Sequence, residues 1–211
     1  MRLPASATVS GTDPRGDQKT RLRKALRARR GALGAEVRAR ASEAVCQRLE
    51  ADPVFAGARR VAGYRAVRGE LDVDAALRAK LAQGGRVFLP RIGPDDRLEF
   101  VDAGQLDGLI PGAFGIEEPV GLASDPSEID VFLVPALAFD RRGHRLGSGR
   151  GYYDRALADL LNTTLIGVGY DWQLLDDELP TEAHDHPVDI IATDARWHVS
   201  GPRSSLHTSK E

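Results

Sequence analysis

The sequence predicts a single compact α/β domain of three layers, in which a mostly parallel sheet is flanked by helices. Apolar runs rich in β-branched residues alternate with amphipathic segments through most of the chain. This alternation is typical of parallel strands joined by right-handed helical crossovers. The run 129–140 is apolar almost throughout and ends in an acid, as expected of a strand buried on both faces. A length of 211 residues fits one such domain.

The amino-terminal half begins with two predicted helices and continues with alternating strands and a helix. Val37, Ala41, Val45 and Leu49 recur every four residues and mark one face of the second helix. Asp72 is the expected N-cap of the third helix, and a pair of glycines ends it. The expected elements are helices 17–33 and 35–52, strand 58–67, helix 71–85, and strands 86–92 and 97–103.

The carboxy-terminal half holds the most apolar strand and a glycine-rich loop. The expected order is strand 129–140, the loop, helix 152–162, strand 164–171, and a last strand or strand pair over 188–199. Residues 1–16 and 200–211 are rich in Ser, Thr, Pro and Gly and lack periodicity. We expect these two segments to be disordered tails around a folded domain of residues 17–199.

Composition narrows the class of protein. With 29 basic and 31 acidic residues the net charge is -2, which argues against a general nucleic-acid or membrane binder. Cys46 is the only cysteine, so neither an intramolecular disulfide nor a Cys-rich zinc site can form; a buried structural thiol is expected. No run reaches membrane-spanning length and no signal-peptide core is evident. We therefore expect a monomeric cytoplasmic protein with small-molecule ligands.

The segment 145–155, RLGSGRGYYDR, places three glycines at alternate positions between a strand and a helix. Glycines let the backbone approach a ligand and turn its amides toward an anion, and a helix N-terminus adds positive potential. The spacing is neither that of a P-loop nor that of the dinucleotide fingerprint. A tight turn would explain the glycines alone. Arg145, Arg150 and Arg155 beside them favour a phosphate loop, and Asp154 could hold Mg²⁺.

Two further segments could supply groups to this loop. Lys19 and Arg23 lie one helical turn apart, so both can point into one phosphate site; a solvated basic face is the alternative. Glu70 lies in the loop after a strand. A carboxylate there can accept two hydrogen bonds from a donor-rich ring, or it is simply a surface acid.

Histidines and aspartates crowd the segment 184–189, HDHPVD. His184 and His186 are two residues apart, and no third strong ligand for zinc is evident. A carboxylate for Mg²⁺ is more economical, and Asp189, at the start of a strand, is better placed than Asp185. A turn or cap role is the alternative for Asp185.

Three motifs, KTRLR at 19–23, RLGSGRGYYDR at 145–155 and HDHPVD at 184–189, occur in this order along the folded region. Together with GELD, FLPRI and GIEEP they resemble the 5-formyltetrahydrofolate cyclo-ligase family. The resemblance implies a compact α/β fold. It also implies the ATP- and Mg²⁺-dependent conversion of 5-formyltetrahydrofolate to 5,10-methenyltetrahydrofolate, with release of ADP and phosphate.

The resemblance also implies roles for individual residues. Catalytic roles fall on Lys19, Arg150 and Tyr152. ATP would contact Lys19, Arg23, Arg145, Leu146, Gly147, Ser148, Gly149, Arg150, Gly151, Tyr152 and Tyr153. The reduced folate would contact Arg23, Arg65, Glu70, Ser148, Gly149, Arg150, Gly151 and Tyr152. Asp154 and Asp189 would hold Mg²⁺. The chain departs from the family pattern at Ser148, where Tyr or Arg is common, at Arg150, where Gly or Lys is usual, at Ala136 and at Gly34.

The implied reaction explains why cations are needed. A formamide is a poor electrophile and its oxygen a poor leaving group, and phosphorylating that oxygen solves both problems before N10 attacks. Phosphoryl transfer asks the protein mainly to position reactants and stabilise charge. Two other functions compete with this one: a non-catalytic, RNA-associated role for the basic first helix, and an α/β enzyme acting on sugar phosphates or acyl-CoA.

Overall fold

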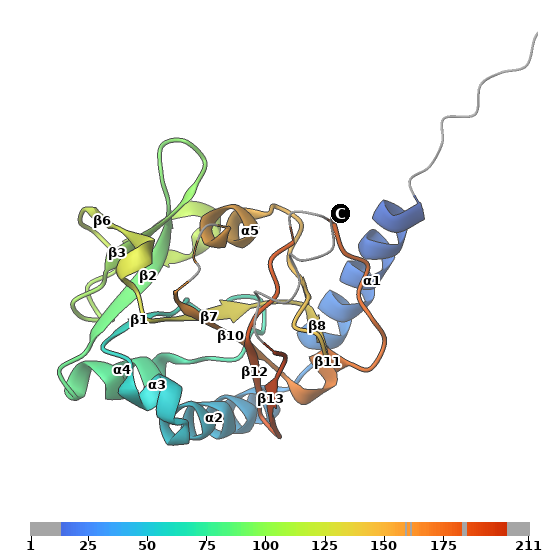
Figure 1. Ribbon diagram of the computed structural model, residues 1–211, viewed down its shortest axis with the longest axis horizontal. Helices are drawn as coiled ribbons and strands as arrows, with labels where there is room; N and C mark the ends of the chain where they lie inside the picture. The colour runs from blue at the N-terminus through green and yellow to red at the C-terminus, as the bar shows by residue number, and fades with distance from the viewer. Residues whose placement is uncertain (1–13, 159, 161, 183–184, 202–211) are drawn as a thin grey trace, which may run out of the picture.

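A computed structural model of the chain (Figure 1) describes residues 14–158, 160, 162–182 and 185–201. Its centre is an eight-stranded sheet. From edge to edge the strands are β13 (Trp197–Val199), β12 (Ile190–Thr193), β10 (Thr164–Gly169), β7 (Val131–Pro135), β1 (Arg60–Ala62), β2 (Arg86–Ile92), β3 (Leu98–Asp102) and β6 (Ala123–Ser124). The strands from β12 to β2 pair in parallel, and antiparallel strands complete both edges. The mostly parallel sheet predicted from the sequence is confirmed.

Helices cover both faces of this sheet. Figure 1 shows α2 (Ala35–Ala51), α3 (Pro53–Gly57) and α4 (Asp74–Ala82) on one side and α5 (Tyr152–Leu157) on the other. Side chains of β7 alternate between the two cores: Val131 and Leu133 pack with α2 and α4, whereas Phe132 and Val134 pack toward α5. Burial on both faces explains why the run reads as continuously apolar.

The long apolar run is two strands rather than one. β7 ends at Pro135, the chain turns, and β8 (Ala138–Asp140) joins β9 (Arg145–Leu146) and β11 (Leu174–Leu175) in a separate three-stranded sheet. The buried amide of Gln173 donates to the carbonyls of Ala136 (3.0 Å) and Leu137 (2.8 Å) and fixes this turn. The bend carries the following glycine loop back over the end of the large sheet.

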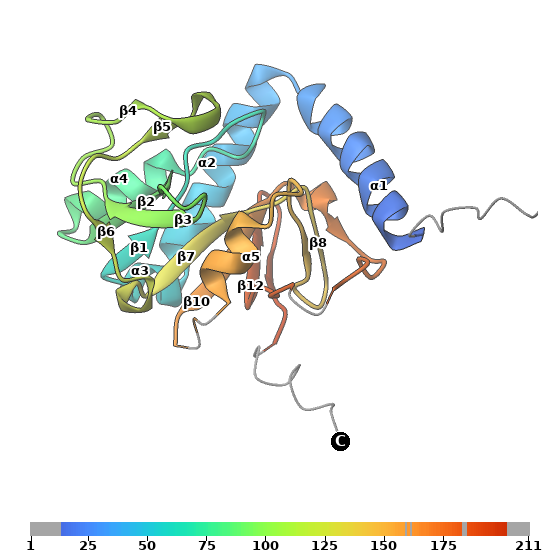
Figure 2. The same ribbon diagram turned by 90° about the horizontal axis from the view of Figure 1, so that it is seen from above.

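The first helix, α1 (Pro14–Gly31), does not flank the large sheet. Its few buried apolar side chains, chiefly Leu22 and Leu26, pack against Leu137, Leu146 and Leu179 of the small-sheet region. Figure 2 shows α1 standing at one side of the molecule, next to β8. Polar contacts of its basic residues therefore hold much of this helix in place.

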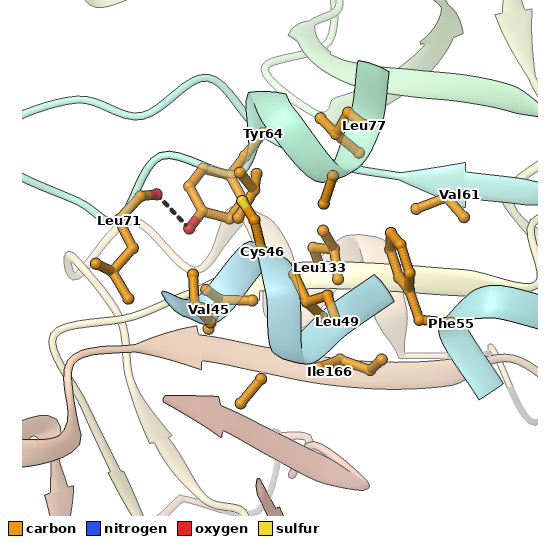
Figure 3. Packing of buried hydrophobic residues seen from close by; sticks show 14 of the residues in the cluster. Val45, Cys46, Leu49, Phe55, Val61, Tyr64, Leu71, Leu77, Leu133 and Ile166 are labelled. Carbon is orange, nitrogen blue, oxygen red and sulfur yellow. Dashed lines mark hydrogen bonds between the residues drawn. The ribbon is translucent and has the colours of Figure 1, made fainter. Parts of the chain in front are cut away.

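The core around α2 contains Cys46, which is 3% exposed. Figure 3 shows it among Val45, Leu49 and Leu77, beside the hydrogen bond from the Tyr64 hydroxyl to the Leu71 carbonyl. Burial raises the pKa of the Cys46 thiol. The burial predicted for this thiol from the sequence is confirmed.

Several boundaries differ from the predictions. The expected strand 58–67 is only β1, because the chain after Ala62 leaves the sheet toward the site. Asp72 precedes the N-cap, which is Val73, although its Oδ1 still accepts from the Asp74 amide at 2.8 Å. Helix α5 is shorter than expected, and 188–199 forms a strand pair, β12 and β13.

The expected amino-terminal tail is also shorter than predicted. Helix α1 begins at Pro14, so residues 14–16 are helical. The rest of that expected tail, and residues 202–211, lie outside the described residues. The sequence did not predict the short strands β4 (Ile110–Pro111) and β5 (Glu117–Glu118) or the helix α3. Within the described ranges no helix is long and apolar enough to cross a membrane.

Candidate active site

A cavity of about 480 Å³ opens at the carboxyl ends of β1, β2 and β7. Its wall combines residues that follow or end these strands, including Tyr64, Arg65, Ile92 and Pro135, with the glycine loop and the start of α5. In parallel sheets, ligands usually bind at the carboxyl ends of the strands. The three strand ends explain why segments far apart in sequence meet here.

The glycine loop forms one end of the cavity. Gly149 and Gly151 have φ angles of 94° and 65°, in the left-handed region that favours glycine. The loop is held from outside by α1: Arg23 Nε donates to the Gly147 carbonyl at 3.1 Å, and Arg27 Nη2 donates to the Ser148 carbonyl at 2.9 Å. Gly147, Ser148, Arg150 and Gly151 line the cavity. Ser148 and Arg150 are exposed there.

Arg145 is the buried cation beneath the loop. Its side chain is 3% exposed and donates to Asp154 Oδ1 and to the His186 carbonyl. Burial lowers the pKa of Arg145, and the neighbouring Asp154 carboxylate opposes this shift. Both residues line the cavity, so a positive charge and its partner carboxylate lie together below the glycine loop.

Two tyrosines from the start of α5 complete this wall. The Tyr152 hydroxyl donates to Asp96 Oδ1 at 2.7 Å, in the turn between β2 and β3. The Arg155 guanidinium lies 5.3 Å from the centre of the Tyr152 ring. Burial raises the pKa of Tyr153 far above its ordinary value, with a further contribution from the Glu70 carboxylate. Tyr153 is therefore a neutral phenol facing the Glu70 end of the cavity.

Glu70 and Arg65 also line the cavity. Glu70 is 13% exposed, and its Oε2 accepts from the Val67 amide at 3.2 Å. Burial raises the pKa of Glu70, and the nearby Arg30 offsets part of the effect. Arg65 is held by Asp74 and by Glu117 of β5. The apolar part of the wall includes Pro90, Ile92, Leu98, Ile116 and Pro135.

The structure thus brings most of the predicted site residues to one cavity. The residues that line it are Arg65, Glu70, Arg145, Gly147, Ser148, Arg150, Gly151, Tyr152, Tyr153 and Asp154. Arg23 supports the loop from outside, and Leu146 packs in the core beneath α1. Lys19, Gly149 and Asp189 are the other predicted residues that do not line this cavity.

Lys19 is buried and faces carboxylates. Its ammonium lies 2.7 Å from Glu182 Oε1 and 3.1 Å from Asp185 Oδ2. Burial opposes the charge, but these two acceptors outweigh it and raise the pKa of Lys19. Asp185 also contributes favourably to the charge of Arg145, so Lys19 belongs to the charged network behind the glycine loop.

Asp189 does not share a site with Asp154. Its Oδ2 accepts from the Leu165 amide at 2.8 Å, at the amino end of β12. In the register of the sheet Leu165 pairs with Phe132, whereas the cavity begins at Pro135. The expectation that Asp154 and Asp189 meet at one metal ion is therefore not met. A residue that precedes a parallel strand lies at the amino ends of the strands, whereas ligands bind at their carboxyl ends.

Metal-binding groups are sparse in the part of the chain that the structure describes. No cluster of three or more His, Cys, Asp or Glu side chains with metal-ligand geometry occurs there, and His184 lies outside it. Mg²⁺ is commonly held by one or two carboxylates together with substrate phosphates. Asp154, on the cavity wall beside the glycine loop, is a carboxylate of the kind that such a site uses.

Sequence reasoning missed several site residues. Arg27 and Arg30 belong to the basic run of α1, whose one-turn spacing indicated a shared face but not which members turn inward. Tyr64 follows β1, and its place after a strand is the signal that could have found it. Pro135 ends β7 inside the run that was predicted as one strand, so it gave no such signal. Asp96 offered no signal, because its role depends on where the β2–β3 turn meets Tyr152.

Comparisons with known proteins agree with this architecture. Residues 15–194 match the model of the 5-formyltetrahydrofolate cyclo-ligase family. A cyclo-ligase of Escherichia coli is 32% identical and the match covers 81% of this chain and 97% of that one; for Mycolicibacterium smegmatis the values are 36%, 86% and 96%. The structure of Aquifex aeolicus 5,10-methenyltetrahydrofolate synthetase superposes with a TM-score of 0.77 at 35% identity, covering 86% and 92% of the two chains. The chain therefore belongs to the 5-formyltetrahydrofolate cyclo-ligase family of enzymes.

Proposed function

We propose that the protein converts 5-formyltetrahydrofolate to 5,10-methenyltetrahydrofolate with ATP as co-substrate, releasing ADP and phosphate. The observation that carries this proposal is the polarity of one cavity. Its lining combines arginines and the glycine loop, the largely buried carboxylate of Glu70, and apolar side chains. A triphosphate, a donor-rich pterin ring and the apolar body of a folate fit these three regions in that order.

The chemistry uses this arrangement in two steps. The formyl oxygen attacks the γ-phosphorus of ATP, the bond from phosphorus to the bridging oxygen breaks, and ADP leaves. N10 then attacks the activated carbon and gives up its proton, which leaves with the phosphate that departs with the former formyl oxygen. Neither step needs a protein nucleophile. The protein holds the two reacting atoms close and stabilises the charge that develops on phosphate.

Arg145 and Arg150 are assigned to the triphosphate, together with the amides of the loop. Arg150 is exposed on the cavity wall, whereas Arg145 is buried and pre-oriented by Asp154. Lys19 is assigned to the same end. Its present partners are Glu182 and Asp185, so binding of ATP requires Lys19 to exchange a carboxylate for a phosphate oxygen.

Glu70 is assigned to the pterin ring and Tyr152 to the folate beside the glycine loop. Both line the cavity. Arg65 borders the Glu70 end and is fixed by its two acidic partners. Mg²⁺, bound to ATP and to Asp154, would neutralise phosphate charge. Asp189 has no part in this assignment, because its carboxylate serves the Leu165 amide.

The test is direct. Purified protein is mixed with MgATP and 5-formyltetrahydrofolate, and the absorbance of the methenyl product is followed while ADP and phosphate are quantified. We expect one ADP and one phosphate for each methenyltetrahydrofolate formed, and no product with a non-hydrolysable ATP analogue. Folded protein that forms no product, or forms it without ATP, would contradict the proposal.

A further inference from the structure

Arg30 lies behind Glu70 and outside the cavity lining, at the end of α1. Its side chain is 4% exposed. The guanidinium reaches three acceptors on two different segments: Nε donates to the Arg68 carbonyl at 3.1 Å, Nη1 donates to the Ala136 carbonyl at 3.5 Å, and Nη2 lies 3.4 Å from Glu70 Oε1. One side chain thus joins the Glu70 loop to the turn between β7 and β8.

The Glu70 loop needs such support because its backbone is unusual. Arg68 has a φ of 52°, which is uncommon for a residue other than glycine, and Gly69 has a φ of 78°. A Cβ at Gly69 would lie 3.2 Å from the Arg30 carbonyl, so the end of α1 packs directly on the loop. The Tyr170 hydroxyl donates to the Gly69 carbonyl at 3.0 Å from the other side.

The two oxygens of Glu70 have different partners. Oε1 faces Arg30, and Oε2 accepts from the Val67 amide. We propose that Arg30 is a positioning residue that fixes the Glu70 carboxylate at the cavity wall, ready to accept hydrogen bonds from the ring of the reduced folate. This inference rests on the proposed function, in which Glu70 contacts that ring.

The charges around Glu70 show why Arg30 matters. Burial raises the pKa of Glu70, and Arg30 is the first of the groups that lower it. The other charged or titratable groups with a mutual electrostatic effect are Arg68 of the same loop, Tyr64 after β1, Tyr153 of α5 and Tyr170 after β10. None of the three tyrosines supplies positive charge. Without Arg30, the exposed Arg68 is the remaining one of these groups whose positive charge lowers the pKa of Glu70.

A lysine cannot reproduce the contact in full. The planar guanidinium presents several donors in fixed directions, whereas an ammonium is a point charge on a flexible stem. Arg30→Lys should therefore keep most of the electrostatic effect on Glu70 but lose the simultaneous contacts with the two carbonyls. Arg30→Met removes both effects. The two variants separate charge from geometry.

The experiment measures binding and turnover over a range of pH. Variants Arg30→Met, Arg30→Lys and Glu70→Gln and the double variant are compared with wild type. Arg21→Met, on the exposed surface of the same helix, controls for the loss of one positive charge. Isothermal titration with 5-formyltetrahydrofolate gives affinity without turnover, and steady-state kinetics give KM for each substrate.

We expect Arg30→Met to weaken folate binding roughly tenfold with little change in KM for ATP. The acidic limb of kcat/KM for the folate should move to higher pH, because the carboxyl protonates more readily. Arg30→Lys should show weaker binding with the limb near its wild-type position. In the Glu70→Gln background, Arg30→Met should not weaken folate binding further, and Arg21→Met should resemble wild type.

Unchanged folate affinity and an unchanged limb in Arg30→Met, with Glu70→Gln impaired, would overturn the role of Arg30 alone. If Arg30→Met does not fold, Arg30→Lys decides, and wild-type affinity for the folate in that variant overturns the inference. Unaltered folate binding in Glu70→Gln would refute the role of Glu70 on which the inference rests. If the wild-type protein binds the folate but never turns over with ATP, the proposed function is rejected. The calorimetric binding measurements still test the role of Arg30 in that case.

Discussion

The ammonium of Lys19 lies 2.7 Å from Glu182, so the start of α1 is joined to a loop 163 residues away. Asp185 accepts from the same ammonium. The positive charge of the lysine proposed to bind ATP is therefore compensated by two carboxylates, and these would compete with a phosphate group for it.

This competition makes opposite predictions for its two sides. Lys19→Met should raise KM for ATP and lower kcat about a hundredfold, the usual cost of one lost transition-state contact. Glu182→Gln should lower KM for ATP, because it weakens the competing ion pair. Both variants are measured with saturating folate and varied MgATP. An equal rise of KM in both would mean that the pair only supports the fold.

Asp154 and Asp189 separate metal binding from structure. Asp154→Asn should reduce kcat by roughly two orders of magnitude and steepen its dependence on Mg²⁺. Since Asp154 is also the partner of buried Arg145, we expect a loss of about 1–3 kcal/mol of stability as well. The measurement is kcat against Mg²⁺ concentration, alongside thermal unfolding.

Asp189→Asn is the matched control for that experiment. Its side chain accepts from the Leu165 amide between two neighbouring strands, so the variant should unfold at a lower temperature with an unaltered Mg²⁺ dependence. A changed Mg²⁺ dependence in both variants would restore the two-aspartate arrangement expected from the sequence, and a normal one in Asp154→Asn would contradict the metal role of Asp154.

Arg150 offers a test with little structural side effect. It is exposed on the cavity wall, so Arg150→Ala should raise KM for ATP while the unfolding temperature stays within experimental error of wild type. Arg59→Ala, at an exposed arginine ahead of β1 that does not line the cavity, is the control. Wild-type KM and kcat in Arg150→Ala would show that the side chain is merely solvated.

Glu70 links function to stability through pH. Burial raises the pKa of Glu70 above its ordinary value of 4.5 in spite of Arg30. A carboxyl with a raised folded-state pKa contributes stability that is fully present below the unfolded pKa and is lost as the pH rises through the folded pKa. Glu70→Gln, which resembles the neutral form, should therefore be no less stable than wild type at about pH 7.

Unfolding temperatures of wild type and Glu70→Gln across the acidic range check this prediction. The difference between the two proteins should grow in favour of the variant as the pH rises. Glu50→Gln, an exposed carboxylate of α2, serves as the control. A variant that is less stable by the same amount at every pH would show that the ion pair with Arg30 is a net stabilising contact.

Local patterns predicted much of this fold. The strand 86–92 matches β2 at both ends, and the alternation of Val131 to Val134 between two cores explains the continuous apolar run. The turn at Pro135 escaped prediction because the residues on either side of it are equally apolar. What divides the run is the side chain of Gln173, which is distant in sequence and satisfies the carbonyls of the turn.

The site was predictable where it depends on the chain order of strand ends and glycines. Glu70 lies in the loop after β1, whose carboxyl end borders the cavity, and this position follows from the chain order. The glycine loop follows β9 of the small sheet and lines the same cavity. The positions of Lys19 and Asp189 were not predictable in this way. A one-turn spacing brings Lys19 and Arg23 to one face of α1 but does not say that Arg23 meets the loop while Lys19 meets acids. Asp189 immediately precedes β12, so it lies at the amino ends of the parallel strands, away from the cavity.

Helix α1 buries few apolar side chains yet holds three segments of the site through Lys19, Arg23 and Arg30. Elements with little apolar burial open at low free energy. The amides of α1 should accordingly exchange with solvent deuterium well before those of β7 and β10, and both substrates together should slow that exchange most. Detachment of this one helix would then free the glycine loop and the Glu70 loop together. A ligand bound at either loop would therefore stabilise the other.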